Sequence, residues 1–161
     1  MKWHEYLKLQ LKNSRRPVIV GVGSELKSDD AVGKLVADLL TKQLADCEQV
    51  LVLYGSTAPE NCTGQIKKFA PDHVFMVDAA HMNLEAGKID IIDLEKIKNI
   101  SFSTHMLPLS LMLNYLLEEV GCLISLIGIE PVSTEFGFEI DPKVQEAAKQ
   151  LVDVFVKALI H

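Results

Sequence analysis

Apolar runs alternate with amphipathic stretches along most of the chain. Short runs rich in Val, Ile and Leu are typical of buried strands, and four such runs read VIVGV, QVLVLYG, HVFMVDA and CLISLIGI. Between them apolar residues recur at helical spacing, which predicts helices at 29–45, near 60–69, at 107–120 and at 142–160. A fifth strand is expected at KIDIIDL, behind the turn residues of NLEAGK.

Strands that are apolar throughout indicate a sheet with helices on both faces, and parallel neighbours require long crossover connections. The sequence therefore predicts an α/β fold, a three-layer αβα sandwich with a mostly parallel twisted sheet. At 161 residues we expect a single domain spanning 1–161. Apolar residues at helical spacing, Trp3, Tyr6, Leu7 and Leu11, predict an extra N-terminal helix at about 2–13.

The composition limits the kinds of partner that the chain is expected to bind. The 16 Lys and Arg residues against 22 Asp and Glu give a formal charge of −6, which disfavours binding to nucleic acid or anionic lipid. Three scattered cysteines favour free thiols in a reducing compartment. The N-terminus has no apolar core of a signal peptide, and no apolar run reaches the roughly 18 residues of a spanning helix. We expect a soluble cytoplasmic protein with no direct membrane insertion.

The first strand leads into a glycine-rich segment, GVGSELKSDDAVG. This segment lacks the third glycine of a dinucleotide fingerprint, since Leu26 stands there, and two aspartates at the helix start would repel a pyrophosphate. Ser28 is predicted to be the N-cap, and Asp29 is interpreted as a structural residue that complements the helix dipole. Asp30 is left as the candidate functional residue, because it follows the carboxyl end of a strand.

Two more candidates lie along the chain. Asp78 is predicted to end the HVFMVDA strand, where a carboxylate after apolar residues needs a compensating partner. His105 follows hydroxyl-bearing residues in STHMLPLS, ahead of Pro108, while His81 is expected in an exposed loop. Two carboxylates and an imidazole suit a borderline divalent ion such as nickel or zinc. They equally suit activation of water by acid and base catalysis, and the residues alone leave both chemistries open.

Three segments taken together, VGVGSELKSDDAVG, FMVDAAHM and STHMLPLS, resemble the motifs of the nickel-iron hydrogenase maturation proteases. Three further segments resemble the branch that serves formate-hydrogenlyase-type complexes: STAPE, GKIDIIDLEKI and LIGIEP. Two positions depart from the family pattern: Ser24 replaces a frequent asparagine and Tyr54 a frequent aspartate. The Tyr54 departure puts a carboxylate role at that strand end in doubt, and leaves catalysis more dependent on the remaining acidic residues.

The resemblance implies an endopeptidase that removes the C-terminal extension of a hydrogenase large-subunit precursor after nickel insertion. It implies that Asp30, Asp78 and His105 are the catalytic residues and recognise nickel carried by the substrate. No tightly bound cofactor of its own and a monomeric state are expected. The alternatives are a non-catalytic nickel-binding maturation chaperone and a nucleotide-binding α/β domain. Serine or cysteine nucleophile chemistry ranks last, because no GxSxG elbow and no Cys beside His is present.

Overall fold

The computed structural model describes residues 1–94, 101–102, 112–137 and 139–160. Its middle layer is a sheet with strand order β2-β1-β3-β6-β4, and β5 pairs with β3 outside this path. The strands are β1 (Pro17–Val22), β2 (Leu51–Ser56), β3 (His73–His81), β4 (Ile89–Ile92), β5 (Ser101–Phe102) and β6 (Leu123–Ile129).

Most of the strands run parallel. Strand β1 pairs in parallel with both β2 and β3, and β3 pairs in parallel with β6. Strands β4 and β5 are antiparallel to β6 and β3 respectively. The predicted mostly parallel sheet is therefore confirmed, with an antiparallel strand at one edge.

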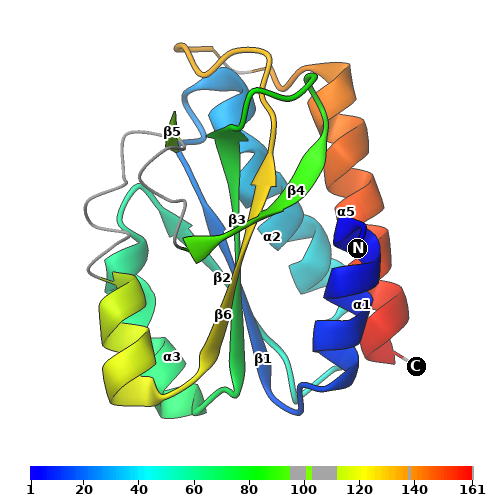
Figure 1. Cartoon of the computed structure of the whole chain (residues 1–161). Helices are drawn as coiled ribbons and strands as arrows, with labels where there is room; N and C mark the ends of the chain where they lie inside the picture. The colour runs from blue at the N-terminus through cyan, green and yellow to red at the C-terminus, as the bar shows by residue number, and fades with distance from the viewer. Residues whose placement is uncertain (95–100, 103–111, 138, 161) are drawn as a thin grey trace.

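Helices cover both faces of the sheet, as Figure 1 shows with α1 and α5 on one side and α3 on the other. Ile19, Phe75 and Val77 belong to the apolar core shared with α1 (Trp3–Lys12), α2 (Val32–Gln43) and α5 (Pro142–Ile160). Val18 and Met76 belong to the second core, on the side of α3 (Thr63–Phe69) and the π-helical turn η4 (Leu116–Val120). Because the strand residues alternate between two buried cores, the structure is a three-layer αβα sandwich.

Helix α2 lies directly against β1. Gly33, near its start, has no side chain, and a Cβ built there would lie 2.1 Å from the carbonyl oxygen of Val22. This contact fixes where the short 3₁₀ turn η1 (Ser28–Ala31), which precedes α2, sits above the carboxyl end of β1.

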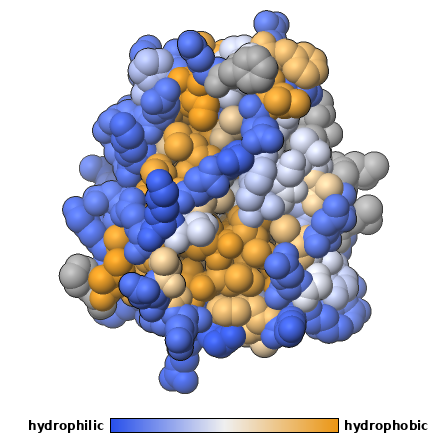
Figure 2. Space-filling view, turned by 180° about the vertical axis from the view of Figure 1, so that it is seen from behind, coloured by the Kyte–Doolittle hydropathy of each residue, from blue (hydrophilic) through white to orange (hydrophobic). Residues whose placement is uncertain are grey.

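Strand β2 is the outer strand on the far side of Figure 1, and its residues from Leu51 to Tyr54 are half-buried. Figure 2 views the molecule from that side and shows apolar residues gathered in the middle of the face, with polar residues around them. Among the described helices, none is long and apolar enough to cross a membrane.

Two expectations about element boundaries need correction. Strand β3 does not end at Asp78 but continues to His81, because the antiparallel pairing of Ala80 and His81 with β5 extends it. His81 is therefore a strand residue rather than a loop residue, although its side chain is exposed as expected. Of the helix predicted at 107–120, residues 107–111 lie outside the described part, while 112–115 are α-helical and lead into η4.

Candidate active site

The sheet changes its direction of strand addition between β1 and β3. The chain leaves β1 for β2 on one side and returns to β3 on the other, with α2 and α3 on opposite faces. In open α/β sheets such a switch point creates a crevice beyond the carboxyl ends of the two strands, where ligands bind. Asp30 follows β1 in η1, and Asp78 lies in β3 one residue beyond the Gly21 and Val77 register pair. Both carboxylates thus belong to this end of adjacent strands.

The Asp30 carboxylate is 1% exposed and is anchored on one side only. The backbone N–H of Ser24 donates to its Oδ2 atom over 2.7 Å, whereas Oδ1 is buried without a hydrogen-bond partner among the described residues. Leaving a buried carboxylate oxygen unpaired costs free energy, so Oδ1 is suited to accept a proton or to contact a cation or a donor group.

Gly23 makes this arrangement possible. Its φ of +127° is rarely adopted by L-residues with a side chain, and a Cβ there would lie 2.1 Å from the Asp30 carbonyl oxygen. Tyr54 holds the same glycine, because its hydroxyl donates to the Gly23 carbonyl oxygen over 2.6 Å. Burial raises the pKa of Tyr54, so this hydroxyl keeps its proton at neutral pH. The tyrosine that departs from the family pattern therefore positions the loop that anchors Asp30.

Asp78 is 4% exposed. Side chains alternate across a strand, so it shares a face with Met76 and Ala80, which both belong to the core on the α3 side. Its neighbour in β6 is Gly128, and the missing side chain leaves room for Ile92 and Met82, since a Cβ there would lie 2.8 Å from each of these two side chains. The carboxylate is thus held in the sheet itself rather than in a loop.

His105 lies outside the described residues. The chain that leads to it is described at β5, where Phe102 pairs with Ala80, two residues past Asp78. Among the described residues, which do not include His105, no group of three His, Cys, Asp or Glu residues is placed to hold a metal ion. At the end of β3, the Nδ1 atom of His81 lies 3.7 Å from Glu130 Oε2.

Asp29 lies in the first turn of η1, as expected of a structural residue at the helix start, and its carboxylate has a further role that the sequence did not predict. Its buried carboxylate accepts three backbone N–H bonds from a distant segment: Val132 at 2.7 Å, Ser133 at 3.0 Å and Asp141 at 2.7 Å. The predicted N-cap is wrong, since Ser28 lies within η1 and its hydroxyl donates to the Glu135 carbonyl oxygen instead. Asp29 therefore fastens the loop that follows β6 onto the turn that carries Asp30.

Sequence reasoning missed two acidic residues at the same end of the sheet. Glu130, which follows β6, is 6% exposed and accepts N–H bonds from Met82 at 2.7 Å and Leu84 at 3.1 Å. Glu60, in η2 (Pro59–Cys62) after β2, has an Oε2 atom that is buried without a partner in the described part of the chain. A charged residue directly after an apolar strand, as in LIGIEP, was the available signal for Glu130.

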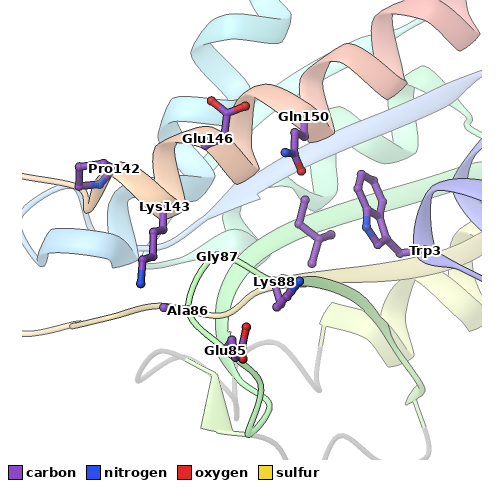
Figure 3. Close-up of a pocket in the computed structure, with 10 residues that line it drawn as sticks. Trp3, Glu85, Ala86, Gly87, Lys88, Pro142, Lys143, Glu146 and Gln150 are labelled. Atoms are coloured by element: carbon purple, nitrogen blue, oxygen red, sulfur yellow. The ribbon is translucent and has the colours of Figure 1, made fainter.

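A cysteine nucleophile finds little support in the structure. Burial raises the pKa of the Cys62 and Cys122 thiols, which disfavours the thiolate form that a cysteine nucleophile needs. A wide hollow of about 1050 Å³ lies between the start of α5, the 85–89 turn and Trp3 (Figure 3), and its lining includes neither Asp30 nor Asp78. The switch point is therefore the better candidate.

Fold and site together define an αβα protein with an acidic centre at the switch point of its sheet. The family model described as hydrogenase maturation protease matches residues 35–158. The chain is 32% identical to the hydrogenase 3 maturation protease of Escherichia coli K12 over 133 residues, 82% of this chain and 83% of that protein.

Two solved structures agree with this. The [NiFe] hydrogenase maturation protease HycI from Thermococcus kodakarensis KOD1 matches with a TM-score of 0.86 and 36% identity, over 97% of this chain and 99% of that one. The hydrogenase maturating endopeptidase HybD from Escherichia coli matches with a TM-score of 0.73 and 25% identity, over 90% and 92%. The chain therefore belongs to the hydrogenase maturation protease family. Membership in this family makes it an endopeptidase of hydrogenase maturation. The chaperone and nucleotide-binding alternatives are therefore disfavoured.

Proposed function

We propose that this endopeptidase removes the C-terminal extension of a nickel-iron hydrogenase large-subunit precursor after nickel has been inserted. In this proposal Asp30, Asp78 and His105 contact the nickel that the substrate carries, and the enzyme holds no tight metal of its own. The observation that supports it most is the Asp30 carboxylate, which is buried at the switch point with Oδ2 anchored and Oδ1 without a partner in the described chain.

The donor types fit the proposal. Carboxylate oxygens and a neutral imidazole nitrogen form a mixed set that suits a borderline ion and leaves positions for ligands supplied by the substrate. Asp30 needs no rearrangement to use Oδ1, because the Ser24 N–H already fixes the carboxylate through Oδ2. Hydrolysis also needs a base for the attacking water, and either Asp30 or Asp78 is chemically able to accept that proton.

The test is processing of nickel-loaded precursor by single variants. Asp30→Asn, Asp78→Ala and His105→Ala should fold with melting temperatures close to the parent chain and lose processing, read as the absence of the product mass. His81→Ala is the matched histidine control and should process normally, because its side chain is exposed and lies outside the proposed set. Normal processing by Asp78→Ala would contradict the assignment.

We also infer that the enzyme acts in the cytoplasm as a monomer. The odd number of cysteines and the free thiols of Cys47, Cys62 and Cys122 favour a reducing compartment. Analytical ultracentrifugation and cell fractionation test the two statements separately.

A further inference from the structure

Two segments far apart in the sequence are joined above the candidate site. Residues 26–28 and 132–137, here called the strap, are linked by a parallel bridge between Lys27 and Gly137. The Ser28 N–H donates to the Gly137 carbonyl oxygen at 2.8 Å, and the Gly137 N–H donates to the Leu26 carbonyl oxygen at 3.0 Å. The Asp29 carboxylate holds the beginning of the second segment from below. The strap is therefore fixed by its backbone rather than by an apolar core.

The side chains that the strap presents are unusually apolar. Leu26 is 52% exposed, Val132 54% and Phe136 81%. These are three of the nine large apolar side chains that are exposed in the described chain, and all three belong to the nine residues of the strap. Lys27 adds a cation, with its Nζ atom 5.3 Å from the centre of the Phe136 ring. Concentrated exposure of this kind marks a surface that a partner covers.

The strap is continuous with the candidate site. The Asp30 N–H donates to the Lys27 carbonyl oxygen at 2.9 Å, so the turn that holds Asp30 begins in the strap. One hollow of about 460 Å³ is lined by Lys27 and Phe136, and another of about 240 Å³ by Asp29 and Val132 among others. In Figure 1 the 131–137 segment lies at the top of the view, beyond the carboxyl ends of β3 and β6.

We propose that the strap is the docking surface for an extended, apolar segment of the precursor polypeptide. The proposal rests on the proposed function. An endopeptidase must hold a polypeptide on both sides of the bond it cuts, so a surface that begins within four residues of Asp30 is covered by substrate during the reaction. The exposed Leu26, Val132 and Phe136 side chains bury against apolar residues of that segment, and the two hollows accept its side chains.

The test compares steady-state processing of nickel-loaded precursor by the parent enzyme, Phe136→Ser, Leu26→Ser and Leu123→Ser. Leu123 is the matched control, because it is 63% exposed but begins β6 at the opposite end of the sheet. Phe136→Ser and Leu26→Ser should each raise KM by roughly tenfold or more with little change in kcat, as expected for loss of an apolar anchor. Leu123→Ser should leave both constants unchanged, and melting curves should coincide for all four proteins.

The outcomes separate this inference from the proposed function. If the parent enzyme cleaves the precursor and Phe136→Ser retains the parental KM, the docking surface is wrong while the function stands. If the parent enzyme cleaves no nickel-loaded precursor, the proposed function fails and the proposed occupant fails with it. Ultracentrifugation of the parent and Phe136→Ser adds one further outcome: a dimer that Phe136→Ser dissociates would make the strap a contact between two copies and overturn the proposal.

Discussion

Removal of the Asp29 carboxylate should cost much of the stability of this enzyme. Three backbone N–H groups, those of Val132, Ser133 and Asp141, donate to this side chain, which is 1% exposed. A hydrogen bond to a charged group contributes about 1.5–3 kcal/mol net, and truncation of the acceptor leaves the three N–H donors without it. Since the donors lie near the surface and water replaces part of the loss, we expect Asp29→Ala to lower the free energy of unfolding by about 3–5 kcal/mol.

For a chain of 161 residues this loss corresponds to a fall of about 10 °C in Tm. The assay is urea unfolding of the parent and Asp29→Ala at pH 7, with the m-value compared to confirm that the folded and unfolded states are otherwise similar. Asp38→Ala is the control, because Asp38 forms an exposed ion pair with Lys34, and its loss should cost about 0.5 kcal/mol or less.

Activity measured at a temperature where Asp29→Ala remains folded should show kcat within a few-fold of the parent value, because neither Asp30 nor Asp78 is altered. An unchanged free energy of unfolding would refute the structural role given to Asp29. A stable Asp29→Ala protein without any turnover would refute it in another way, by making Asp29 a catalytic residue.

Three further outcomes follow from the structure. Burial lowers the pKa of His73 from 6.5 to about 4, so between these pH values the unfolded chain binds a proton that the folded chain does not. The free energy of unfolding should therefore fall by about 2 kcal/mol from pH 7 to pH 5, relative to the change in His73→Gln, when both are measured by urea unfolding. Gly23→Ala should lower stability by more than about 2 kcal/mol because its Cβ would collide with Asp30, whereas Gly64→Ala, with nothing within 4 Å, should be neutral or slightly stabilising in the same assay. Tyr54→Phe should cost about 1 kcal/mol in thermal unfolding, as one hydrogen bond to Gly23 is lost.

The layers of the fold could be predicted from the sequence because the residues of each strand show by themselves that the strand is buried. Runs such as VIVGV and HVFMVDA are apolar on both faces, and this is possible only in a sheet covered by helices on both sides. The order of the strands and the antiparallel edge strand β4 depend on which strands become neighbours, which no local pattern contains. The continuation of β3 to His81 likewise depends on its pairing with β5.

The candidate site divides in the same way. Asp30 and Asp78 could be selected from sequence because a charged residue close to the end of an apolar strand is unusual and its place relative to the sheet is predictable. The role of Asp29 could not, since its acceptor oxygens bind N–H groups 103 to 112 residues away. Local reasoning therefore assigned it to the nearest helix end, and it overlooked Glu130, whose partners Met82 and Leu84 are also distant.

The most direct measurement of the central claim is cleavage by metal-free enzyme of one precursor prepared in two forms, with and without nickel. Both forms are first shown to be comparably folded, and products are identified by mass. The account predicts complete removal of the C-terminal extension from the nickel-loaded form, none from the nickel-free form, and none from either form by Asp30→Asn. Efficient cleavage of the nickel-free precursor by metal-free enzyme would contradict recognition of the substrate's nickel and would favour water activated by the carboxylates alone.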